Sequence, residues 1–109
     1  MSYEVQLTRR ALEDSERLAA SSGDDRREGV DLVTNRFFEA LERLETFPLS
    51  CGFAYEDQHF PDEEVRHLLF KVFRRGRPYR ALFTVQGDKV RVLTVRAPGE
   101  RPVKPEDFD

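Results

Sequence analysis

The sequence predicts an α+β domain of the order β-α-α-β-β-β, in which a helical hairpin packs on one face of an antiparallel sheet. Two observations support this prediction. Apolar residues recur every three or four positions in the first half of the chain, which is the period of a helix with one buried face. In the second half they largely alternate with polar residues, which is the period of a strand. The 109 residues suffice for a single domain over residues 1–109, with residues 97–109 as an extended tail.

The first strand and the first helix are predicted from residues 3–23. Residues 3–7 alternate between apolar and polar side chains and therefore predict a short strand. Thr8 is a suitable N-cap for the helix that follows, because its side chain can accept a hydrogen bond from a free backbone N–H group. Gly23 is suited to the left-handed position that ends a helix.

A longer second helix is predicted to begin near Asp25 and Glu28, which have the spacing of a capping box, and to end before Pro48. Its apolar stripe consists of Val30, Val33, Phe37, Leu41 and Leu44. Since few residues join the two helices, we expect an antiparallel hairpin. Residues 49–64 contain five acidic side chains, and we expect them to form a loop that is mobile or contacts a partner.

Three strands are predicted in the second half of the chain, over Val65–Phe73, Tyr79–Gln86 and Lys89–Val95. The last two are joined by Gly87-Asp88, a two-residue turn of the kind that hairpins favour. Such a turn fixes which residues lie opposite each other. The expected pairs are Gln86 with Lys89, Val85 with Val90, Phe83 with Val92, and Ala81 with Thr94.

Opposite residues share a face of the sheet, so these pairs divide the side chains into two sets. The expected core face holds Tyr79, Ala81, Phe83, Val85, Val90 and Val92, joined by Leu68, Phe70 and Val72. The other face holds His67, Leu69, Lys71, Phe73, Arg80, Leu82, Thr84, Lys89, Arg91, Leu93 and Val95. We expect this second face to be open, because the helices cover one side only. It could be an ordinary solvated face, but charges of nearly one sign beside apolar area favour a binding surface.

The net charge of −3 is unevenly distributed along the chain. Residues 1–64 contain 7 Lys and Arg against 16 Asp and Glu, a net charge of −9. Residues 65–109 contain 11 against 5, a net charge of +6. A sequence pI of about 5.5 argues against indiscriminate binding to nucleic acid. The local positive field could still attract a phosphate or an acidic partner.

Three segments carry a family resemblance: Val65–Phe70, Pro78–Val90 and Val92–Arg96. Their sequences, VRHLLF, PYRALFTVQGDKV and VLTVR, resemble the strands of the RelE/ParE superfamily, the toxins of type II toxin–antitoxin systems of the plasmid-stabilisation type. The resemblance implies a toxin that inhibits growth and that a cognate antitoxin neutralises. RelE-like members cut mRNA on the ribosome, whereas ParE-like members inhibit DNA gyrase and are not nucleases.

The resemblance also implies site residues. If the chain is a metal-independent mRNA endoribonuclease, Arg80 and Arg96 would stabilise phosphate charge, and Lys71 or His67 would transfer protons. These four are the candidate catalytic residues, and either Arg96 or Arg101 takes the family's basic position at the end of the sheet. Further basic residues of the expected open face are candidates for binding: Arg66, Arg74, Lys89 and Arg91.

Two departures from the family pattern leave the activity open. The last strand ends with Arg96-Ala97, where many relatives have a His after the Arg. The tail also lacks a Tyr and offers only Phe108 as a large apolar residue. An mRNA endonuclease, a gyrase inhibitor and a non-toxic remnant that only binds therefore all stay as hypotheses.

We expect no cofactor, no metal site and no membrane segment. Cys51 is the only cysteine and, with no His placed beside it, is expected to be a loop or core thiol. Metal binding by His59 with Asp57 and Asp62 is an alternative that the spacing does not favour. No apolar run approaches the ~18 residues of a membrane span, and no signal peptide is recognisable. We expect a cytoplasmic protein whose partners are an antitoxin and either the ribosome with mRNA or gyrase, as a homodimer or a toxin–antitoxin hetero-oligomer.

Overall fold

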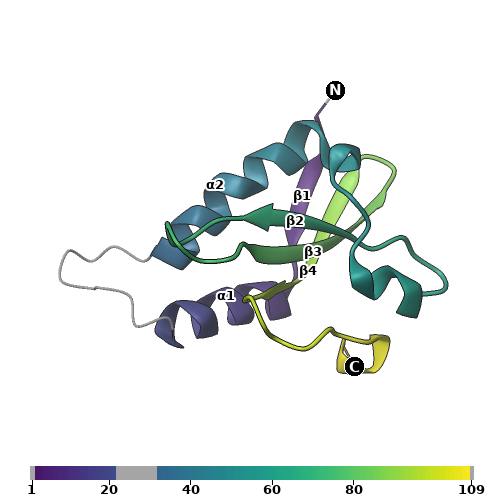
Figure 1. Ribbon diagram of the computed structural model, residues 1–109. Helices are drawn as coiled ribbons and strands as arrows, with labels where there is room; N and C mark the ends of the chain where they lie inside the picture. Colours follow the sequence, from purple (N-terminus) through teal and green to yellow (C-terminus); the bar gives the residue numbers. More distant parts are fainter. Residues whose placement is uncertain (1, 22–31, 109) are drawn as a thin grey trace.

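The computed structural model describes residues 2–21 and 32–108, and Figure 1 shows how their helices and strands are arranged. In chain order these are β1 Glu4–Leu7, α1 Arg9–Ser21, α2 Leu32–Thr46, β2 Arg66–Phe70, β3 Tyr79–Gln86 and β4 Lys89–Arg96. Short 3-10 helices lie at Pro48–Ser50, Tyr55–His59 and Pro105–Phe108. The strands form one sheet in the order β1-β4-β3-β2. Strands β2, β3 and β4 are antiparallel neighbours, as predicted, while β1 adds in parallel to β4, so the sheet is mixed.

The predicted start of α1 is confirmed. The Thr8 hydroxyl oxygen accepts a hydrogen bond from the backbone N–H of Ala11 at 3.1 Å, and the hydroxyl donates to the carbonyl of Val92 at 2.9 Å. Thr8 therefore caps the helix and ties its first turn to β4. Helix α2 ends at Thr46, just before Phe47 and Pro48, also as predicted. The predictions for the joint between the helices lie outside the described residues: Gly23, Asp25, Glu28 and Val30.

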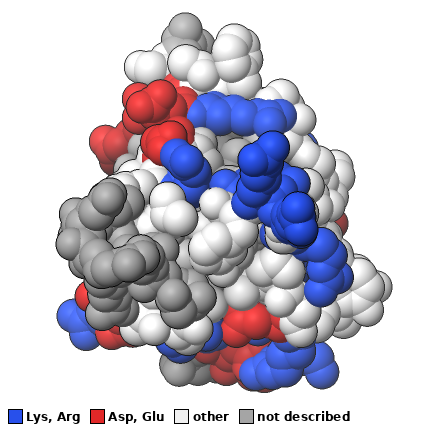
Figure 2. Space-filling model, turned by 60° about the vertical axis from the view of Figure 1, so that its left-hand side comes forward, with Lys and Arg blue, Asp and Glu red and all other residues white. Residues whose placement is uncertain are grey.

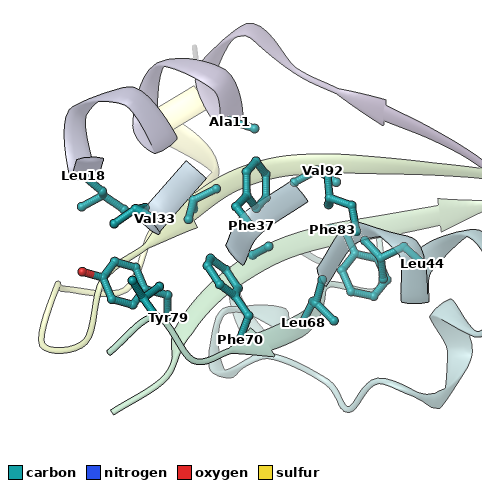
Figure 3. Packing of buried hydrophobic residues seen from close by; sticks show 14 of the residues in the cluster. Ala11, Leu18, Val33, Phe37, Leu44, Leu68, Phe70, Tyr79, Phe83 and Val92 are labelled. Atoms are coloured by element: carbon teal, nitrogen blue, oxygen red, sulfur yellow. The ribbon is translucent and has the colours of Figure 1, made fainter. Parts of the chain in front are cut away.

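The main core lies between the two helices and one face of the sheet. Figure 3 shows residues of α1, α2 and the strands pointing toward one another in it. Phe37 of α2 has its ring centroid 5.8 Å from that of Phe70, which in turn lies 5.8 Å from Tyr79. The predicted core face is confirmed: the buried members are Tyr79, Ala81, Phe83, Val90 and Val92, and Val85 is partly buried. Each large side chain that is fully buried stabilises the fold by about 1.5–3 kcal/mol.

A β-bulge in β4 overturns part of the predicted register. Phe83 lies opposite Val92, as expected, but Leu82 then lies opposite Thr94, so Leu93 is an extra residue. The predicted pair of Ala81 with Thr94 is therefore wrong, and Ala81 lies opposite Val95 instead. One extra residue exchanges the faces for the rest of the strand, because side chains alternate with a period of two. Val95 consequently lies in the main core, fully buried, and not on the second face.

Strand β2 is shorter than predicted and ends at Phe70, which pairs with Tyr79 at the start of β3. Pro78, the residue before Tyr79, has no backbone N–H group and cannot extend the hydrogen-bonded ladder between β2 and β3. Residues 71–78 therefore connect the two strands outside the sheet, at the left of Figure 1.

The face of the sheet opposite α1 and α2, called the second face below, is covered and not open as predicted. Residues 49–64 and the tail lie on it and build a small second core of Ala54, Val65, Leu82 and Val103, flanked by Phe60 and Phe108. Leu82 and Val103 are both fully buried. The apolar side chains on this face explain the covering, because their burial removes them from water. The expectation that residues 49–64 form a plain loop is likewise wrong, since two of the 3-10 helices lie there.

None of the helices in the described part of the chain is long and apolar enough to cross a membrane.

Candidate functional site on the second face of the sheet

Arg80 and Glu56 form a bidentate ion pair at the centre of the second face. Both guanidinium–carboxylate distances are 2.8 Å, and the Glu56 side chain is fully buried while that of Arg80 is 22% exposed. The carboxylate also accepts hydrogen bonds from the backbone N–H groups of Glu56 itself and of Val103. Burial alone would raise the pKa of Glu56, but these hydrogen bonds and the charge of Arg80 hold it below its usual value. The pair is therefore charged at neutral pH and joins residues 55–59, β3 and the tail.

Arg96 lies directly opposite Arg80 on the neighbouring strand and is 7% exposed. The bulge shifts the last residues of β4 to the other face, and this puts Arg96 on the second face beside Arg80. Its guanidinium donates to the carbonyl oxygen of Arg101 at 2.6 Å, and its Nε has no partner among the described residues. Burial lowers the pKa of Arg96, while Glu100 and Asp14 act in the opposite direction. Arg101 itself is exposed in the tail and pairs with Asp107, whereas Arg96 is the last residue of β4.

His67 completes the group of candidate residues that the fold brings together. It lies opposite Leu82, on the same face as Arg80, and is half-buried. Its Nδ1 atom is buried without a hydrogen-bond partner among the described residues. Burial lowers the pKa of His67, the charge of Arg80 lowers it further, and Glu56 acts in the opposite direction. The lowered pKa favours the neutral imidazole, which suits a base better than an acid.

Lys71 and Arg74 do not join this group. Both are exposed on the connection after β2, where the Lys71 ammonium donates to the carbonyl of Arg74 at 3.2 Å. Arg91 and Lys89 lie near the β3–β4 turn: Lys89 pairs with Glu4 at 3.3 Å, and Arg91 lines an open groove beside the tail.

Arg66 is not on the second face, which corrects its predicted position. It lies opposite Phe83, a core-facing residue, because alternation along β2 puts it in the set of Leu68 and Phe70. Its guanidinium donates to the carbonyl of Cys51 at 2.7 Å and lies 4.3 Å from the ring centroid of Phe53. Arg66 thus holds residues 49–53 against the edge of the sheet.

Two residues of this site were missed from the sequence: Glu56 and Val103. Glu56 is one of five acidic residues in a segment read as a loop, and no spacing distinguishes it from its neighbours. Val103 is the one aliphatic residue in a run of prolines and charges, a signal that it anchors the tail. Cys51 is buried, as a core thiol would be, and burial raises its pKa against the lowering effect of Arg43 and Arg66. Among residues 2–21 and 32–108 no three His, Cys, Asp or Glu side chains gather as metal ligands would.

Comparison with known proteins gives one kind of match. No protein-family model matches the chain, and no curated protein does. Among solved structures, a chain from the chromosomal ParDE TA system of P. aeruginosa superposes with a TM-score of 0.62. The match covers 86% of this chain and 94% of that one, at 20% sequence identity. The likeness shows the fold: the chain shares the α+β architecture of that chain, and the α+β class is the one that the sequence predicted.

Proposed function

We propose that this chain is the toxin of a type II toxin–antitoxin pair and that it acts by binding a protein, as a ParE-like inhibitor of DNA gyrase would. The structural likeness to a chain of a ParDE TA system, which covers 94% of that chain, supports the toxin role. In that role a cognate antitoxin is its neutralising partner.

One observation favours protein binding over RNA cleavage: both terminal nitrogens of the Arg80 guanidinium already donate to Glu56. A nuclease of the RelE kind needs free cations to hold a phosphate. Freeing Arg80 would leave a buried carboxylate without its partner, and breaking such a pair costs about 3–5 kcal/mol. Arg96 is also buried and engaged, by the Arg101 carbonyl.

The groups for proton transfer are also unfavourably arranged. A cleavage reaction needs one group that takes a proton from the attacking hydroxyl and another that gives one to the leaving oxygen. The pKa of His67 is lowered by burial and by Arg80, which favours the neutral form and the role of a base. Lys71 lies on the connection outside the sheet. The covered second face is thus poorly arranged for cutting RNA, and this favours inhibition by protein binding as the function of the chain.

mRNA cleavage stays the second candidate, because Arg80 and Arg96 lie side by side with His67 on an adjacent strand. Such a group could hold a phosphate if the segments above it moved away.

Controlled expression in bacterial cells separates the two candidates. We expect expression to arrest growth without producing new mRNA ends. We also expect the purified chain to inhibit supercoiling by purified gyrase. The double substitution Glu56→Gln with Arg80→Gln replaces the ion pair by two neutral amides of similar size. Growth arrest should persist in this variant if the chain binds gyrase, and should disappear if Arg80 acts on RNA. New mRNA ends with unaffected gyrase would overturn the proposal, and so would the absence of any growth effect.

A further inference from the structure

The connection between β2 and β3, residues 71–78, carries four exposed cations: Lys71, Arg74, Arg75 and Arg77. None of them forms an ion pair with a carboxylate of residues 2–21 or 32–108, in contrast to Arg17, Arg36, Arg80 and Arg101. The sequence from residue 65 to residue 87 contains no Asp or Glu at all. This connection, called the basic connection below, is therefore a patch of one sign, and no ion pair within the described part of the chain neutralises its charges.

The basic connection is an ordered turn, which fixes the backbone that carries its cations. Val72 is buried in the main core, and the ring of Phe73 lies 6.4 Å from that of Tyr79. The backbone N–H of Gly76 donates to the carbonyl of Phe73 at 3.2 Å, and the Lys71 ammonium donates to the carbonyl of Arg74 at the same distance. A partner that binds such a turn loses less affinity to the ordering of side chains and backbone.

The basic connection lies at the left-hand end of the molecule in Figure 1. Figure 2 turns the left-hand end of Figure 1 toward the viewer and shows Lys and Arg side chains gathered there, with Asp and Glu above and below them. The molecule is 43 Å long. Charges farther away than about 10 Å are largely screened at 0.1 M salt. The patch therefore attracts anions even though the whole chain has a net charge of −3.

We propose that the basic connection binds the phosphate backbone of duplex DNA without regard to sequence. Three of its four cations are Arg, whose planar guanidinium groups match phosphate oxygens in a bidentate way. Its aromatic residue, Phe73, is partly buried and packs against the core, so its ring is not free as a stacking platform for unpaired bases. The other large apolar residue of the connection, Val72, is buried, so it offers no apolar contact to a bound peptide. This inference stands apart from the proposed function, since it needs neither toxicity nor a protein target.

The test is the salt dependence of binding between the purified full chain and a fluorescent DNA duplex. Four phosphate contacts predict that log K falls with log salt with a slope of about −3.6. The triple substitution Arg74→Gln, Arg75→Gln and Arg77→Gln should reduce the slope to about −0.9. Arg74→Gln alone should reduce it by about 0.9, which keeps the test valid if the triple variant folds poorly.

The matched control changes the same charge elsewhere. Arg9, Arg36 and Lys104 are exposed and lie outside the basic connection, and their triple change to Gln should leave the slope unaltered. If both triple variants lost the same amount of slope, the binding would depend on net charge alone, and the proposal would be overturned. So would the absence of binding at about 50 mM salt, tighter binding of single-stranded RNA than of duplex DNA, or binding of polyglutamate with no binding of DNA. Circular dichroism of each variant checks that it is folded.

Discussion

Arg80 and Arg96 lie directly opposite each other on β3 and β4, yet neither guanidinium is free. Like charges in opposite positions destabilise a sheet, and each of these two has its own compensation. Arg80 pairs with Glu56, and Arg96 donates to the carbonyl of Arg101 with the charges of Glu100 and Asp14 nearby. The hydrogen-bond partners, Glu56 and the Arg101 carbonyl, come from residues 49–64 and from the tail, the two segments that cover the second face.

Removal of the Glu56 carboxylate should destabilise the protein strongly. Glu56→Ala leaves Arg80 without its partner beneath a covering layer, and we expect the free energy of unfolding to fall by about 3 kcal/mol. The low end of the usual range applies because the Arg80 side chain is 22% exposed. Urea denaturation measures the change. Glu64→Ala, at a side chain that is 74% exposed, is the control and should stay within about 0.5 kcal/mol of the wild type. Equal effects would contradict the role of the pair.

The Glu56 carboxylate should make the stability of the protein depend on pH in the acidic range. The pKa of Glu56 lies below its usual value of about 4.3 in the folded chain. Between the folded and unfolded pKa values the unfolded chain binds more protons, so stability rises with pH in that window. The contribution of Glu56 is therefore complete above the unfolded pKa and is lost as the pH falls through the folded one. Thermal unfolding from pH 7 downward should show a shallower acid loss in Glu56→Gln than in the wild type, and parallel curves would contradict this.

The bulge at Leu93 can be tested through Val95, which the bulge places in the main core. Val95→Thr puts a hydroxyl among apolar side chains and should cost about 1–3 kcal/mol. Val85→Thr makes the same change at a partly buried position of the same face and should cost less. A straight register would place Val95 on the second face. A smaller effect at Val95 than at Val85 in chemical denaturation would argue against the bulge.

The tail should depend on Val103 for its attachment. Val103→Ala removes two carbon atoms from a fully buried side chain, and we expect a loss of about 1.5–3 kcal/mol. Because the Val103 N–H is bonded to Glu56, hydrogen exchange at this amide should become faster in the variant. The exposed neighbour Lys104 provides the control, since Lys104→Ala should alter neither stability nor exchange. Unchanged exchange in Val103→Ala would show that the tail is held by other contacts.

Much of the fold could be predicted from the sequence because it depends on local patterns. The period of the apolar residues gave α2 and its end before Pro48, and Thr8 gave the start of α1. The turn at Gly87-Asp88 gave both the hairpin and the register as far as Phe83 opposite Val92. Each of these features follows from neighbours within a few positions, where helix caps, turns and side-chain alternation act.

Only the tertiary structure decided what happens beyond those neighbours. The apolar pattern of β4 does not show that Leu93 is left without a partner on β3. This bulge nevertheless places Arg96 beside Arg80 and Val95 in the main core. Likewise, nothing near Glu56 in the sequence indicates that it meets Arg80, 24 positions away, under a tail anchored by Val103. Alternation along the strands was enough to predict the second face and its basic residues. The covering of that face could not be predicted, because it depends on the burial of apolar side chains from segments far apart in the sequence.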